Sequence, residues 1–139
     1  MTKWIMVMVL GLMSLSLWSQ SQKSFHDTFQ LDSVKTIHLD LYGEPEVQAW
    51  PGNNIMIETK IKLYDASDVV LNHFVEAGRY KVEALEEGDQ LKLSSLDKER
   101  KSIKTTRGEC FEEVNTIVYM PNNFKEVGTY QYQRSSEEN

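Results

Sequence analysis

The sequence predicts a mostly β, single-domain protein, built as stacked sheets or as a short β-solenoid, with one short helix. Three observations lead to this prediction. Apolar and polar side chains alternate with a period of two over residues 34–63, and turn residues at 43–45 and 51–54 interrupt the alternation. The same alternation returns over residues 80–93. Apolar residues at helical spacing are confined to residues 68–77.

Residues 34–63 are expected to form three strands separated by two tight turns. The first strand ends at residues 43–45, Gly-Glu-Pro, because glycine permits a positive φ and proline cannot donate to a sheet ladder. The second ends at Pro51-Gly52, a pair typical of a type II turn. The third, over 55–63, alternates isoleucine and leucine with charged residues, which favours a strand. Strands joined in this way are expected to pair as hairpins.

The flanking elements follow from the same reasoning. A lead-in strand is expected over 25–31. Asp65 or Ser67 can cap the helix at 68–77, and Gly78 stands where a glycine commonly ends a helix. The segment 80–96 is expected to form a β-hairpin.

The last third of the chain carries further strand signals. A short strand is expected around Ile103. Residues 114–120 have apolar side chains on both faces, which predicts a central strand covered on both sides. Pro121 ends that strand, and a final edge strand is expected over 127–132. The globular domain is therefore expected to span residues 20–132, with a flexible polar tail over 133–139.

The first 19 residues resemble a secretory signal peptide. Lys3 provides the basic start, residues 4–18 form an uncharged apolar run, and Ser19 or Ser21 offers a cleavage point. About 15 apolar residues are short of the ~20 that a membrane span needs, so no stable span is expected after cleavage. An uncleaved anchor is the alternative. Export to the periplasm, the outer-membrane surface or the medium is therefore expected.

Charge and cysteine content narrow the function classes. The chain has 15 Lys and Arg against 21 Asp and Glu, a net charge of −6, and the leader contributes one basic and no acidic residue, so residues 20–139 carry −7. An acidic balance argues against nucleic acid and anionic membranes as partners. A single cysteine, Cys110, excludes an internal disulfide, so stability must come from packing.

One pattern resembles a known family. It reads V-x-x-I-x-L-x-x-x-G-x-x-x-V-x-x-W-x-G-x-x-I-x-I and comprises Val34, Ile37, Leu39, Gly43, Val47, Trp50, Gly52, Ile55 and Ile57, followed later by Met120-Pro121. This resembles the adhesin-like domains, including auto-transporter adhesin head domains, of exported Gram-negative proteins of unknown function. The match is good over 34–63 and loose over 79–121. The resemblance implies a β-rich solenoid or stacked-sheet fold without established catalysis, and no agreed functional residues.

Trp50 and a group of carboxylates are the candidate binding residues. Trp50, beside a Pro-Gly turn, could offer an exposed aromatic platform for a glycan or peptide, or could pack over the edge of the core. Asp40, Glu44, Glu46 and Glu58 are expected to lie close together in the hairpins. Such carboxylates could perform glycosidic acid–base chemistry or bind calcium, or could be solvated surface charges.

Other chemistry has weaker support in the sequence. Cys110 is flanked by glutamates, which disfavour a thiolate, so a dyad with His73 is not expected. The spacing of His26, His38 and His73 fits no zinc motif, and no metal or cofactor is expected.

The sequence thus predicts an exported, non-catalytic cell-envelope protein, an adhesin-like or structural module that binds an envelope protein or a surface glycan. A carrier or sensor of a small apolar ligand is the alternative, and a carboxylate-type hydrolase is a weaker one. A carrier needs a closed apolar cavity, and an enzyme needs a concave site with carboxylates of shifted pKa. A binding module needs an exposed apolar or aromatic patch.

Overall fold

A computed structural model describes residues 20–136. The predicted signal peptide, residues 1–19, and the last three residues of the predicted tail lie outside this range. The elements, in chain order, are β1 (Gln20–Phe29), β2 (Thr36–Asp40), β3 (Glu46–Trp50), β4 (Ile55–Tyr64), α1 (Asp68–Glu76), β5 (Val82–Glu87), β6 (Gln90–Ser95), β7 (Lys104–Thr105), β8 (Gly108–Glu109), β9 (Glu112–Pro121), β10 (Phe124–Gly128) and β11 (Gln131–Arg134).

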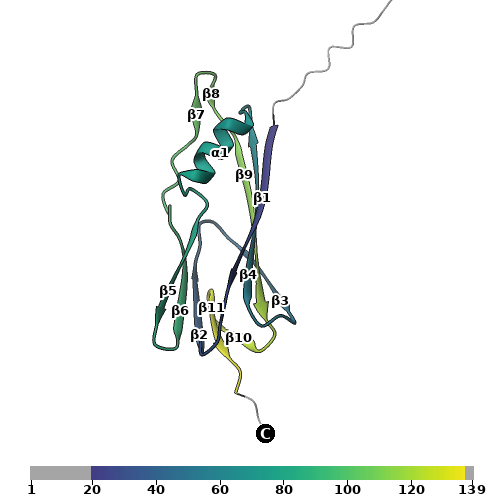
Figure 1. Ribbon diagram of the computed structural model, residues 1–139, viewed down its shortest axis with the longest axis vertical. Coiled ribbons are helices and arrows are strands. Elements are labelled where there is room, and N and C mark those ends of the chain that lie inside the picture. Colours follow the sequence, from purple (N-terminus) through teal and green to yellow (C-terminus); the bar gives the residue numbers. More distant parts are fainter. Residues whose placement is uncertain (1–19, 137–139) are drawn as a thin grey trace, which may run out of the picture.

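The strands form two main sheets that face each other (Figure 1). Sheet A has the strand order β1-β4-β9-β3, and sheet B has the order β10-β11-β2-β6-β5. Strands β7 and β8 form a separate small hairpin. Strands make up 56% and helix 8% of the structure, which confirms a mostly β fold with one short helix. Of the two arrangements expected, the structure has stacked sheets.

The main core fills the space between the sheets. Its residues come from alternate positions of the strands, because every second side chain of a strand points to the same face. Ile57 of β4 and Leu93 of β6 have no exposed surface. The cluster comprises Leu31, Val34, Ile37, Leu39, Ile55, Ile57, Leu91, Leu93, Val118, Met120, Phe124 and Tyr132.

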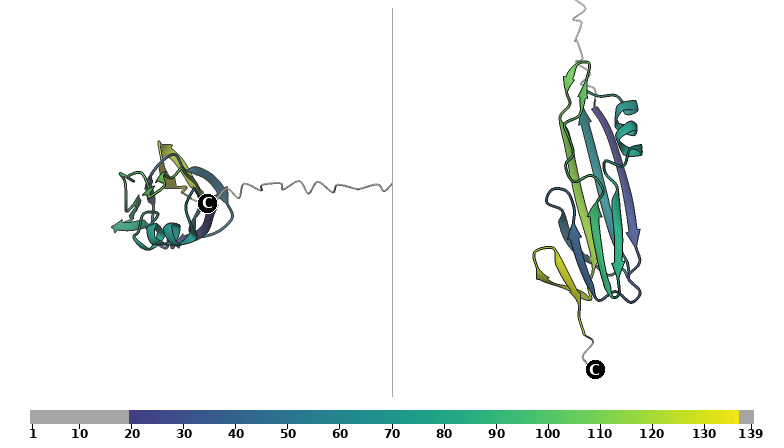
Figure 2. Two further views of the ribbon diagram at one scale, coloured as in Figure 1. Left: turned by 90° about the horizontal axis from the view of Figure 1, so that it is seen from above. Right: turned by 90° about the vertical axis from the view of Figure 1, so that its left-hand side faces the viewer.

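A second core lies under the helix. In Figures 1 and 2, α1 covers the end of the molecule at which β1 begins and β4 ends. The Ser67 side chain accepts a hydrogen bond from the Val70 N–H and caps the helix, and Gly78 follows with φ +85°. Both features agree with the sequence prediction. Leu71 of the helix packs with Ile61 and other buried residues of this second cluster.

The predicted hairpins within residues 34–63 are wrong, although the three strands lie where expected. Strand β2 belongs to sheet B, whereas β3 and β4 belong to sheet A. Within sheet A, β9 lies between β3 and β4 and pairs in parallel with β3 and antiparallel with β4. The turn after β2 therefore leads from sheet B to sheet A, and the turn after β3 leads past the position of β9 to β4. The strand that pairs with β3 lies more than 60 residues further along the sequence.

Two other predictions need correction at the level of single elements. Strand β9 is central in sheet A, as expected, but only one of its faces is buried, since Ile117 and Tyr119 on the other face are partly exposed. The lead-in strand runs over Gln20–Phe29 rather than 25–31.

The C-terminal region also differs from the prediction. The expected strand 127–132 spans a turn between β10 and β11, where Tyr130 has a positive φ of 55° and the register shifts. The expected tail begins too early, because Arg134 is still in β11. Its guanidinium donates to the carbonyl oxygens of Leu31 (2.7 Å) and Val34 (2.9 Å).

Candidate functional site

Trp50, the aromatic residue predicted as a candidate for ligand binding, lies on the outer face of sheet A. Val47 of β3 packs against the core, so Glu46, Gln48 and Trp50, which alternate with it, point outward. The register places Gln48 opposite Tyr119 of β9, which in turn faces Met56 of β4. We call the four partly exposed side chains of this face the aromatic patch: Trp50, Met56, Ile117 and Tyr119.

Local contacts fix the Trp50 ring on the surface rather than over the core. Its indole N–H donates to the Asn54 carbonyl oxygen at 3.0 Å, across the turn that follows β3. Its ring lies 6.0 Å from the Tyr119 ring, centroid to centroid, at 55°. A Cβ at position 52 would lie 2.4 Å from the indole, so only glycine allows this placement. The Pro-Gly turn thus holds the aromatic side chain in one orientation.

Glu58 lies in the next row of the same face and is already paired. Its carboxylate is 2.8 Å from His26 Nε2 on β1 and 3.2 Å from Lys60 Nζ on β4. The hydrogen bond with His26, followed by that with Lys60, holds the pKa of Glu58 below its ordinary value. Glu58 is therefore an ionised acceptor at neutral pH.

Asp40 lies apart from the other predicted carboxylates, on sheet B. It forms an ion pair with Lys98 and lies 3.6 Å from Lys92 Nζ. The hydrogen bond from Lys98 is the main reason that the pKa of Asp40 is lowered. The prediction that the four carboxylates lie together is therefore wrong, because it depended on the hairpin between β2 and β3.

The remaining two carboxylates are separated as well. Glu46 Oε1 accepts a hydrogen bond from Gln48 Nε2 at 2.9 Å on β3. Ile117 of β9 lies between Glu46 and Glu58 in their cross-strand row. Glu44 is exposed in the turn before β3. Glu46 and Glu58 flank the aromatic patch, whereas Asp40 and Glu44 do not belong to the outer face of sheet A.

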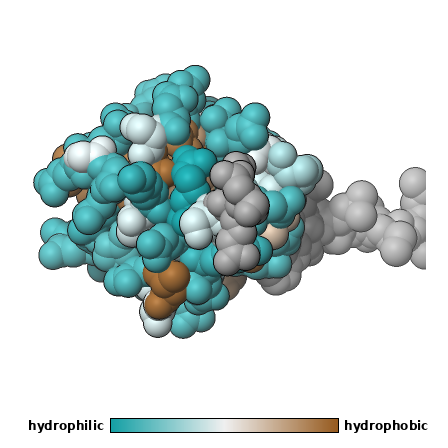
Figure 3. Space-filling view, turned by 90° about the horizontal axis from the view of Figure 1, so that it is seen from below, coloured by the Kyte–Doolittle hydropathy of each residue, from teal (hydrophilic) through white to brown (hydrophobic). Residues whose placement is uncertain are grey.

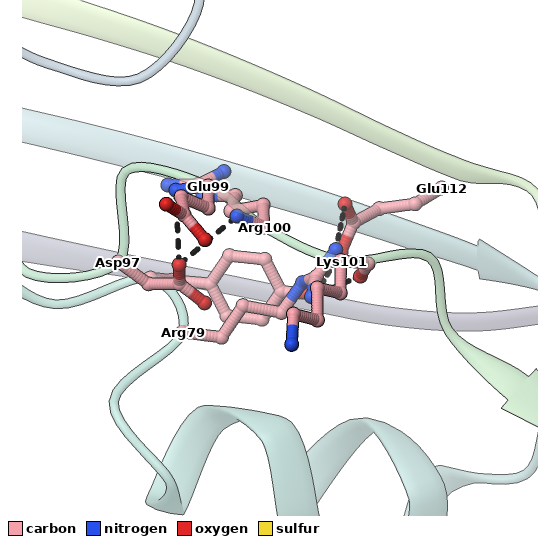
Figure 4. A network of polar contacts seen from close by, with 7 residues as sticks. Arg79, Asp97, Glu99, Arg100, Lys101 and Glu112 are labelled. Atoms are coloured by element: carbon pink, nitrogen blue, oxygen red, sulfur yellow. Dashed lines mark hydrogen bonds and ion pairs between the residues drawn. The ribbon is translucent and has the colours of Figure 1, made fainter.

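A buried polar network that the sequence did not suggest lies near the helix (Figure 4). Arg79 donates to both carboxylate oxygens of Glu112, from Nε at 3.0 Å and from Nη2 at 3.1 Å, and to the Lys101 carbonyl oxygen at 2.7 Å. The Tyr80 hydroxyl donates to the same carboxylate. Burial, with the contact to Glu112, raises the pKa of Tyr80 well above its ordinary value. Glu112 is 33 positions from Arg79 and 32 from Tyr80 in the sequence, so no local spacing indicates this network.

The cysteine and histidines do not converge. Cys110 is buried in the second core, with its Sγ 3.6 Å from the Asp65 carbonyl oxygen. His73 lies in α1 with its ring against Phe74. Among residues 20–136, no group of three or more His, Cys, Asp or Glu side chains is placed to hold a metal ion.

The end of the molecule at which the C-terminal strands lie is mostly polar (Figure 3). Seen from the end at which the C-terminal strands lie, hydrophobic side chains occupy only small, separate areas (Figure 3). Within the described part of the chain, no helix has the length and apolar character needed to cross a membrane.

Comparisons with protein-family models, with curated proteins and with solved structures found no match. The adhesin-like resemblance therefore stays a prediction.

Proposed function

We propose that the protein is an exported, non-catalytic envelope protein that binds a surface glycan through the aromatic patch on sheet A. The observation that carries this proposal is the outward Trp50, fixed against Gly52 and beside Tyr119. The predicted signal peptide supports export.

The composition of the patch matches the chemistry of a sugar ring. A rigid aromatic side chain gives a large contact surface at a low cost in conformational entropy, and it can cover the apolar C–H face of a sugar. Glu46, Gln48 and the ionised Glu58 lie at the edge of the patch and offer acceptors and a donor for hydroxyl groups. The two features together favour a glycan over a purely apolar ligand.

The alternatives find less support in the described residues. An open pocket of about 430 Å³ is lined by charged residues that include Arg79, Arg100, Glu109 and Glu112, so it does not resemble the closed apolar cavity of a carrier. A carboxylate hydrolase needs a general acid with a raised pKa. The pKa values of Asp40 and Glu58 are shifted in the opposite direction by their basic neighbours.

The test is binding of the purified protein to an array of cell-wall and host glycans, with Trp50→Ala as the variant. Leu85→Ala is the control, because Leu85 of β5 is an exposed large hydrophobic residue on sheet B, outside the patch. We expect Trp50→Ala to lose at least about 1 kcal/mol of binding free energy, roughly fivefold or more in affinity, while Leu85→Ala binds like the unaltered protein.

Melting temperatures of the three proteins separate loss of binding from loss of fold. Equal binding by Trp50→Ala and the unaltered protein would contradict the proposed site. An array without any binding would contradict the glycan as ligand, and cross-linking in intact envelopes would then test a protein partner.

A further inference from the structure

A second site of different chemistry surrounds Arg100, in the loop that follows β6. In the described part of the chain, the only buried side-chain nitrogens without a hydrogen-bond partner are Nε and Nη1 of Arg100. Buried donors are nearly always paired in folded proteins, and a buried charge is costly without a partner. An arginine with two such donors therefore requires an explanation.

Hydrogen bonds within the loop fix the position of Arg100. The Asp97 carboxylate accepts hydrogen bonds from the backbone N–H groups of Glu99 (3.2 Å) and Arg100 (2.9 Å), and Arg100 has a positive φ of 33°. The guanidinium carbon then lies 4.3 Å from the centroid of the Tyr42 ring and 5.3 Å from that of Tyr80. The faces of the two rings attract the positive charge, but they do not satisfy its N–H groups.

The Glu112 carboxylate, whose charge favours the charged form of Arg100, is engaged elsewhere. The two oxygens of Glu112 accept hydrogen bonds from Arg79, and one of them also accepts a hydrogen bond from the Tyr80 hydroxyl. Glu112 acts on Arg100 only as a nearby charge, without a hydrogen bond or an ion pair within 4 Å. Arg79 and Glu112 therefore neutralise each other, and the charge of Arg100 is left for another anion.

Arg100 forms part of the wall of an open pocket of about 430 Å³. Arg79 and Ser102 add polar groups to this wall, whereas the buried Ile103 and Cys110 and the Phe111 ring, whose residue is 66% exposed, make the rest of it apolar. Glu109 and Glu112 also line the pocket. Glu109 is exposed, so solvent screens its charge, and the charge of Glu112 is paired with that of Arg79. The lining thus combines the unpartnered donors of Arg100 and the Arg79–Glu112 ion pair with apolar and aromatic side chains.

We propose that this pocket binds a small monocarboxylate with an apolar or aromatic body, and that Arg100 holds the carboxylate. A guanidinium presents several N–H donors in one plane, and charge-assisted bonds to a carboxylate are the strongest of its ordinary hydrogen bonds. The apolar body lies against Ile103 and Phe111. This site is independent of the aromatic patch on sheet A.

The test is a titration of the ¹⁵N-labelled protein with phenylacetate, followed by two-dimensional NMR, and a parallel titration with the neutral phenylacetamide. We expect saturable shifts of the backbone amide signals of Ser102, Ile103 and Phe111 with phenylacetate, and binding of phenylacetamide that is about tenfold weaker or absent. Equal affinity for the two compounds, or no saturable shift with phenylacetate, would overturn the proposal. So would shifts confined to the signals of Trp50 and Tyr119.

Arg100→Met removes the donors but keeps most of the apolar stem, and Arg107→Met is the matched control, an exposed arginine in the turn between β7 and β8. We expect Arg100→Met to weaken phenylacetate binding about tenfold or more. The melting temperature should change by no more than about 4 °C, because the buried donors have no protein partner and only the contacts with the Tyr42 and Tyr80 rings are lost. Arg107→Met should bind normally. Unchanged phenylacetate binding by a folded Arg100→Met variant would refute the role of Arg100. If that variant does not fold, the comparison of phenylacetate with phenylacetamide on the unaltered protein tests the proposal.

Discussion

The ion pair between Arg79 and Glu112 gives the sharpest prediction about stability. The Arg79 side chain is only 7% exposed and that of Glu112 16% exposed, and two parallel hydrogen bonds join them. Glu112→Gln removes one charge and leaves the Arg79 charge buried. Removing one partner of a buried pair costs about 3–5 kcal/mol. Because glutamine keeps one acceptor oxygen and the site is not fully enclosed, we expect about 3 kcal/mol.

The assay is thermal and urea unfolding of Glu112→Gln, Arg79→Met, the double variant and the exposed control Glu83→Gln. In a domain of about 120 residues, 3 kcal/mol corresponds to a fall in melting temperature of roughly 12 °C. The control should stay within about 0.5 kcal/mol of the unaltered protein.

The double-mutant cycle then measures the coupling between the two side chains. We expect the double variant to be more stable, by about 1 kcal/mol or more, than the sum of the single losses predicts. A fall of less than about 3 °C in Glu112→Gln, or strictly additive losses, would refute the reasoning that this pair is buried and coupled.

Three further predictions concern stability. Leu93→Ala should cost about 2–5 kcal/mol in urea unfolding, since Leu93 has no exposed surface in the main core; a loss below 1 kcal/mol would contradict its central position. Gly78→Ala should lower the melting temperature by several degrees, because φ is +85° and the added Cβ would lie 2.9 Å from Leu96 Cδ2. Because the pKa of Tyr80 is raised in the folded protein, its neutral phenol contributes to the free energy of unfolding. This contribution is fully present below the ordinary tyrosine pKa of about 10 and is lost as the pH rises above it. Urea midpoints between pH 8 and 11 should therefore fall less steeply in Tyr80→Phe, and equal slopes would argue against a buried phenol.

The candidate site was only partly predictable. Trp50 and the turn that follows it were identified from the sequence, because a Pro-Gly turn and a strand end are local signals. Its partner Tyr119 was not, since β3 and β9 pair in parallel across a long separation in sequence. The predicted grouping of Asp40 with Glu46 and Glu58 is wrong because β2 and β3 lie in different sheets and do not form a hairpin. Arg79, Arg100 and Glu112 carry no motif, and only the folded chain shows which of these charges is paired.

The sequence by itself determined the strands of residues 34–63, the helix that begins after Ser67 and the hairpin of β5 and β6, because periodicity and turn residues act over a few neighbouring positions. The tertiary structure decided which strands pair, which face of β9 meets solvent and where the unpaired charge of Arg100 lies. The alternation of apolar and polar residues indicates that a strand has a buried and an exposed face, but it does not indicate which strand lies beside it. That choice depends on how distant apolar faces are buried together, and it places Trp50 beside Tyr119 on one sheet and Asp40 on the other.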